Sequence, residues 1–98
     1  MTDLTDLCAA ALVATRHAYE DEDNASLWSA AVDAWQTAAV ASRVENPTAM
    51  QQALTEACYA ASDKAYFAKR IATSQGGDIE LPSRCALIAA EVAMMWID

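Results

Sequence analysis

Glycine and proline are scarce in this sequence, with two of each among 98 residues. A fold of many short strands needs frequent turns, and these two residues supply much of the turn chemistry. Their scarcity therefore favours a few long helices. The length corresponds to about one small domain with one core. We expect an all-α fold in which residues 1–98 form a single helical domain, a compact bundle of about four helices.

Basic residues are also few, since six Lys and Arg stand against fourteen Asp and Glu, for a net charge of −8. The net charge is −6 in residues 1–40, which hold seven acids and one base. It is +1 in residues 41–77, with three acids and four bases, and −3 in residues 78–98, with four acids and one base. Such a protein is repelled by phosphate backbones and anionic membranes. We therefore expect no direct nucleic-acid binding and no membrane association, and a larger protein partner with a basic surface. The one basic cluster, Lys64, Lys69 and Arg70, is expected to pair with acids of this chain or of a second copy.

The cysteines are odd in number and far apart, at positions 8, 58 and 85. Each lies in an apolar pattern, which predicts reduced, buried thiols and not a secreted disulfide scaffold. The N-terminus has no basic-then-apolar leader. The most apolar run, residues 85–97, contains Glu91 and is too short to cross a bilayer. These features predict a cytoplasmic protein.

Motifs that carry chemistry are missing. His17 is the single histidine and has no second ligand at metal-binding spacing. Cys8 is nine residues from His17 on the same expected helix, so these two cannot form a catalytic pair. No glycine-rich phosphate loop or nucleophile elbow is present. We expect no metal, no cofactor and no enzymatic activity.

Apolar residues that recur at spacings of three and four predict four helices. The expected ranges are 3–20, 25–45, 47–75 and 84–97. Asp23 or Asn24 is the expected N-cap of the second helix. Asn46 and Pro47 are expected to cap and begin the third, with Gly76 and Gly77 ending it. Ser83 is the expected cap of the fourth. The buried stripe of the second helix is predicted to be Trp28, Val32, Trp35 and Ala39.

The last expected helix is apolar nearly all round, which is typical of a helix buried on most sides. Ile88, Val92 and Met95 lie on one stripe and are expected in the core. On that interpretation Ile88→Ala would cost about 2 to 4 kcal/mol. The helix is expected to be central in the bundle or at a self-association interface, and the protein to be a homodimer.

The acidic run Glu20, Asp21, Glu22 and Asp23 allows two interpretations. It does not fit a calcium loop, because Ser26 and Val32 stand where glycine and glutamate are needed, counting from Asp21. The run could be a helix junction, since acids are favourable at a helix N-terminus. Four adjacent acids exceed what one helix start uses. The run is therefore also a candidate docking surface.

Aromatic residues extend the candidate partner-binding set to Trp28, Tyr59 and Tyr66. The two tyrosines are seven residues apart, opposite an alanine-rich stripe and among polar residues, a pattern typical of a contact surface. A helix of the same chain could equally cover that face.

Three functional hypotheses remain. The first is a non-enzymatic interaction module, most concretely a small acidic inhibitor that occupies the nucleic-acid-binding surface of a larger partner, such as a phage-type antagonist of a bacterial defence system. The second is a structural or accessory subunit that is stable as a homo-oligomer. The third is a small-molecule-binding helical pocket lined by Trp28, Trp35 and Met95.

Overall fold

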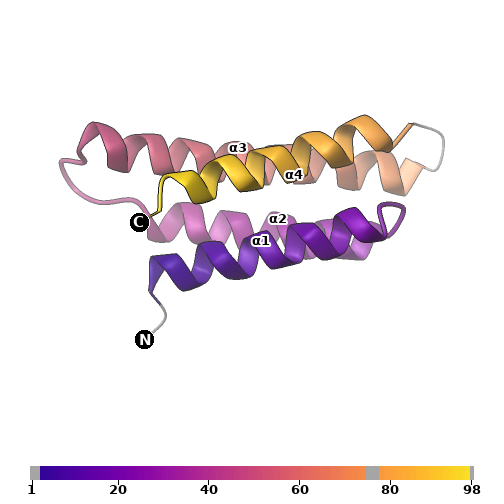
Figure 1. Cartoon of the computed structure of the whole chain (residues 1–98), viewed down its shortest axis with the longest axis horizontal. Coiled ribbons are helices and arrows are strands. Elements are labelled where there is room, and N and C mark those ends of the chain that lie inside the picture. Colours follow the sequence, from indigo (N-terminus) through magenta and orange to yellow (C-terminus); the bar gives the residue numbers. More distant parts are fainter. Residues whose placement is uncertain (1–2, 75–77, 98) are drawn as a thin grey trace.

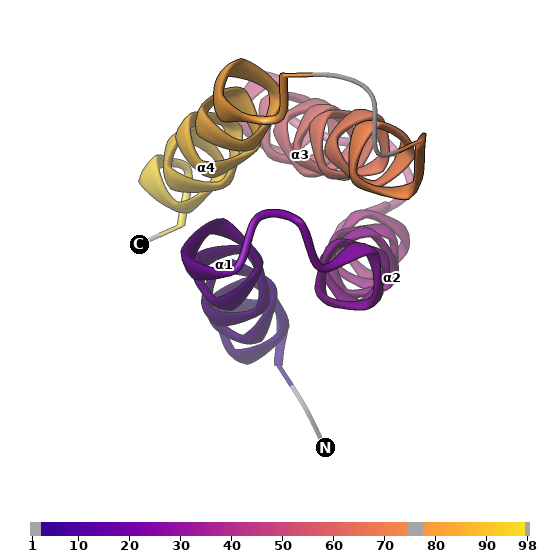
Figure 2. The same cartoon turned by 90° about the vertical axis from the view of Figure 1, so that its right-hand side faces the viewer.

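The computed structural model describes residues 3–74 and 78–97. These residues form four helices: α1 (Leu4–Glu20), α2 (Ala25–Ala41), α3 (Ala49–Ser74) and α4 (Glu80–Met95). Consecutive helices run in opposite directions (Figure 1) and occupy the four corners of a bundle (Figure 2). α2 packs between α1 and α3, and α4 packs against α3 and α1. The predicted all-α bundle of four helices is confirmed.

Side-chain caps explain where the first two helices begin. Oδ1 of Asp3 accepts hydrogen bonds from the amides of Thr5 and Asp6, and this caps α1. Oδ1 of Asn24 accepts from the amides of Ser26 and Leu27, at 3.1 and 3.4 Å, and caps α2. Each cap satisfies amides that have no partner within the helix. The prediction that residue 23 or 24 caps α2 is thus confirmed.

The start of α3 differs from the prediction. The amide of Thr48 donates to Oε1 of Gln51 at 2.8 Å, and the amide of Gln51 donates to Oγ1 of Thr48 at 3.1 Å. This reciprocal pair is a capping box. The expected cap Asn46 has a φ of 51° and lies in the connection, since α2 already ends at Ala41. The T-x-x-Q spacing of Thr48 and Gln51 was the overlooked signal.

The start of α4 also differs, because this helix begins at Glu80 and not at residue 84. Oδ1 of Asp78 accepts from the amide of Glu80 at 3.0 Å. Pro82 is tolerated because amides in the first helical turn need no intrahelical acceptor. Ser83, the expected cap, lies inside the helix and is fully buried. The expected glycine stop of α3 at 76 and 77 lies outside the described residues.

The core consists of two clusters, each built around one tryptophan of α2. Trp35 packs with Leu54, the thiols of α1 and α3, and alanines of all four helices. Trp28 packs with Val32, Ile79 and alanines. The stripe predicted for α2 is confirmed, because all four of its residues are buried. Apart from the two tryptophans, the fully buried side chains are small, so neighbouring helices approach closely.

The predicted burial of the large residues of α4 is wrong. Ile88, Val92 and Met95 are 52%, 43% and 81% exposed. The face of α4 that enters the core instead carries four small residues: Ser83, Ala86, Ala90 and Ala93. The two tryptophans already fill much of the interior, so the narrow face of α4 fits against α1 and α3. At an exposed position, Ile88→Ala is expected to cost below about 1 kcal/mol and not 2 to 4.

A buried hydrogen-bond chain ties α1 to α2 inside the Trp35 cluster. Nε1 of Trp35 donates to Oγ1 of Thr15 at 2.9 Å, and the Thr15 hydroxyl donates to the carbonyl oxygen of Ala11 at 2.9 Å. Both side chains are fully buried. Since no water reaches the indole N–H, the Thr15 hydroxyl is its acceptor.

We predict that Thr15→Val lowers the free energy of unfolding by about 1 to 3 kcal/mol, because it leaves the buried indole N–H of Trp35 without a partner. Urea denaturation measures the change. The control is the same substitution in a Trp35→Phe background, where no indole N–H remains and the additional cost should be below about 0.5 kcal/mol. Equal costs in the two backgrounds would show that the hydrogen bond contributes nothing.

Candidate functional site

The acidic run forms the turn between α1 and α2 at one end of the bundle (Figure 2). The amide of Asp21 donates to the carbonyl oxygen of Ala18 at 3.2 Å, so Asp21 ends α1. Its Oδ2 accepts from Nδ2 of Asn24 at 3.2 Å, next to the amides that Asn24 caps. Asp21 therefore has a structural role in the junction.

Glu22 is fixed from two sides. Its Oε2 accepts a 2.7 Å hydrogen bond from the buried hydroxyl of Ser83 on α4, and its backbone carbonyl accepts from Nε1 of Trp28 at 2.9 Å. Trp28 is 0% exposed. The side chain predicted to contact a partner thus has no exposed surface and supports the acidic turn from inside the bundle.

A second acidic segment lies at the same end. The Glu22–Ser83 bond holds the α1–α2 turn against the first turn of α4, next to Asp78 and Glu80. Because consecutive helices alternate in direction, the α1–α2 turn and the N-terminal end of α4 lie at the same end of the bundle (Figure 1). The acidic end, as we call it, presents five exposed carboxylates: Glu20, Asp21, Asp23, Asp78 and Glu80. The sequence interpretation missed Asp78 and Glu80, although four antiparallel helices imply their position.

Few cations neutralise these carboxylates. The one ion pair within residues 3–74 and 78–97 joins the Arg84 guanidinium to Glu80 at 2.8 Å. The expected pairing of Lys64, Lys69 and Arg70 with acids of the same chain is not seen among these residues; Nζ of Lys69 instead lies 5.9 Å from the Tyr66 ring centre. The acidic end therefore keeps most of its charge facing solvent.

The two predicted tyrosines lie on α3 and not at the acidic turn. Tyr59 and Tyr66 are 37% and 46% exposed. Tyr66 borders a shallow hollow with polar and basic residues of the last turns of α3: Lys69, Arg70, Thr73 and Ser74. The structure does not unite the tyrosines with the acidic run in one surface, and their contact with a partner stays a prediction.

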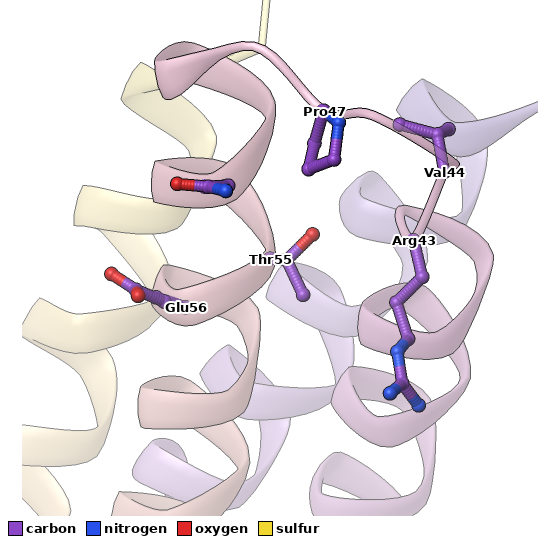
Figure 3. A pocket seen from close by; sticks show the side chains of 6 residues that line it. Arg43, Val44, Pro47, Thr55 and Glu56 are labelled. Atoms are coloured by element: carbon purple, nitrogen blue, oxygen red, sulfur yellow. The ribbon is translucent and has the colours of Figure 1, made fainter.

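The residues predicted to line a small-molecule pocket differ in exposure, because Trp28 and Trp35 are fully buried in two separate core clusters and Met95 is 81% exposed. A surface hollow of about 370 Å³ lies where the α2–α3 connection meets α3. In Figure 3 the Arg43 and Glu56 side chains point away from one another. Charged groups thus do not converge on this hollow as they do in a ligand site.

The thiols of Cys8 and Cys58 meet inside the Trp35 cluster, where both side chains are 0% exposed. The contact with Cys8, together with burial, raises the pKa of the Cys58 thiol. A raised pKa keeps a thiol protonated and unreactive. Cys85 is half-buried on α4 and is free. The described residues contain no group of three His, Cys, Asp or Glu side chains placed to hold a metal ion.

None of the helices within the described ranges is both long enough and apolar enough to cross a bilayer. Comparison with protein-family models, characterised proteins and solved structures gave no significant match.

We predict that Ser83→Ala lowers the free energy of unfolding by about 0.5 to 1.5 kcal/mol, because it removes the hydrogen bond that joins α4 to Glu22. Alanine fits the buried position, so the packing of α4 is unchanged. Thermal or urea unfolding measures the effect. The matched control is Ser74→Ala, at an exposed site, which should change stability by less than about 0.5 kcal/mol. Equal stability of Ser83→Ala and wild type would mean that this bond does not hold the acidic turn.

Proposed function

We propose that this protein is a non-enzymatic protein–protein interaction module that docks through its acidic end on a basic surface of a larger partner. The observation that carries the proposal is that two segments far apart in the sequence bring five exposed carboxylates to one end of the bundle. Of these five carboxylates, Glu80 is ion-paired. Such a concentration of like charge attracts a basic surface and accelerates association.

A basic surface that binds phosphates is the kind of target that this end fits. Carboxylates supplied by Glu20, Asp23 and Asp78 would compete with the phosphates of a nucleic acid for the same Lys and Arg side chains. The concrete form of the proposal is therefore a small cytoplasmic inhibitor of a nucleic-acid-binding machine, such as a phage-type antagonist of bacterial defence. Asp21 and Glu22 hold the turn between α1 and α2 in place through their hydrogen bonds. The turn is therefore a helix junction that also keeps the exposed carboxylates together at this end of the bundle.

We predict that a triple variant, Glu20→Gln, Asp23→Asn and Asp78→Asn, binds the basic partner about tenfold more weakly at low salt, mainly through a slower association rate. These positions avoid the bonds of Asp21 and Glu22, and asparagine at 78 keeps an oxygen that can accept from the amide of Glu80. A partner captured on the immobilised wild-type protein supplies the ligand. Biosensor kinetics at several salt concentrations measure the effect, which should shrink as salt rises.

The matched control neutralises three exposed acids near the start of α1, in the α2–α3 connection and near the start of α3, with Asp6→Asn, Glu45→Gln and Glu56→Gln. These segments lie at the opposite end of the bundle (Figure 1). It changes net charge by the same amount and should bind nearly as well as the wild type. Equal weakening in both variants would show that total charge matters and the acidic end does not. Unchanged binding in the first variant would leave the acidic run as a helix junction alone.

A second candidate function is a structural or accessory subunit that is stable as a homodimer. The specific observation in its favour is the exposed apolar face of α4, where Leu81 and Met95 are 65% and 81% exposed. A face of this kind on a small protein is typical of an interaction surface.

A further inference from the structure

The outward face of α4 carries apolar residues at alternating steps of four and three. We call this set the α4 stripe: Leu81, Cys85, Ile88, Val92 and Met95. Four of them are 43% to 81% exposed, and Cys85 is half-buried. The stripe lies opposite the buried face of the same helix, Ser83 to Ala93. Steps of four and three are the heptad spacing with which one helix packs along another.

We infer that the α4 stripe is the contact surface of a symmetric homodimer in which α4 of one copy packs antiparallel to α4 of the second. This inference deepens the second candidate function and rests on it. The dimer axis passes between Ala86 and Leu87. Leu81 then lies opposite Val92 of the second copy, and Cys85 lies opposite Ile88 of the second copy.

Charge complementarity selects this register. Arg84 and Glu91 lie one heptad apart along the same flank of the stripe, and both are exposed. Arg84 also pairs with Glu80 of its own helix at 2.8 Å, and its guanidinium has further N–H donors for a second carboxylate. In the proposed register Arg84 faces Glu91 of the second copy, and the symmetry repeats the pair. A shift by one heptad in either direction would set Arg84 against Arg84 or Glu91 against Glu91. Like charges in those positions disfavour both alternatives.

The acidic end selects the antiparallel orientation. It lies at the N-terminal end of α4, where Asp78 and Glu80 join the α1–α2 turn. A parallel dimer would set two such ends side by side. In an antiparallel dimer they lie apart by roughly the length of α4, 16 residues or about 24 Å. That separation exceeds the screening length of about 8 Å at physiological salt, so the repulsion largely disappears.

The neighbouring helix α3 widens the contact. Phe67, 54% exposed, borders an apolar hollow with Leu81, Pro82, Cys85 and the stem of Lys64. The hollow measures about 140 Å³ and has almost no polar lining. With Phe67 and Trp96, 54% and 42% exposed, the stripe forms a contact near the lower end of the size range of specific interfaces, about 1,200 Å² in total. We therefore expect a dissociation constant in the micromolar range.

Charge reversal tests the register. Arg84→Glu and Glu91→Arg should each weaken the dimer about tenfold or more, because each sets like charges face to face twice. The double variant should have a dissociation constant within about threefold of the wild-type value, because opposite charges face one another again. For the same reason, an equimolar mixture of the two single variants should form a heterodimer. Asp33→Arg, an exposed acid on α2, is the control for Glu91→Arg and should dimerise like the wild type.

Sedimentation equilibrium measures each dissociation constant, and circular dichroism confirms that each variant is folded. A double variant as weak as the single variants, or single variants as tight as the wild type, would overturn the register. A wild-type protein that stays monomeric into the high micromolar range would overturn the inference and the homodimer function together. That result would leave the docking of the acidic end on a basic partner standing.

Cross-linking tests the orientation. In a Cys85→Ser background, Leu81→Cys alone should form no disulfide-linked dimer under mild oxidation, because the two new thiols would be about 16 Å apart along the axis. A mixture of Leu81→Cys with Val92→Cys should cross-link, since these positions face one another. The native Cys8 and Cys58 are fully buried and do not interfere. Cross-linking of Leu81→Cys to itself would show a parallel dimer and overturn the antiparallel arrangement.

Discussion

The core of this bundle is narrow, and its width determines how the helices pack around it. Within residues 3–74 and 78–97, Trp28 and Trp35 are the two large side chains that are fully buried, and both come from α2. The other helices face them mainly with alanine, serine and cysteine. Small residues allow the helices to approach closely, and the tryptophans then occupy the space that remains. A bundle of this kind has little room for a third large side chain from α4.

That constraint directs α4 and its chemistry. Because the face from Ser83 to Ala93 enters the core, the large apolar residues of the same helix face solvent. The same rotation points the Ser83 hydroxyl at Glu22, and this bond holds the acidic turn beside Asp78 and Glu80. The positions of the acidic end and of the α4 stripe thus both depend on which face of α4 enters the core. Both proposed interactions, with a basic partner and with a second copy, use surfaces created by it.

Much of the fold could be predicted from the sequence. The spacing of apolar residues identified the helices, and polar caps such as Asn24 identified where α2 begins. Periodicity could not predict which face of α4 is buried, because Ala86, Ala90 and Ala93 form as regular a stripe as Ile88, Val92 and Met95. The choice depends on the volume that α2 leaves free, which is a property of the assembled bundle. Likewise, the acidic run was visible in the sequence, but its union with Asp78 and Glu80 depends on tertiary structure.

Methyl NMR with a soluble paramagnetic relaxation agent measures the outward orientation of Ile88 on α4. At low micromolar protein concentration the Ile88 and Val92 methyl signals should relax strongly, while the Ala90 methyl, which is 0% exposed, should be protected. At high concentration the Ile88 and Val92 signals should become protected as the dimer forms. Equal protection of Ile88 and Ala90 at the lowest concentration would instead place the large apolar residues of α4 in the core.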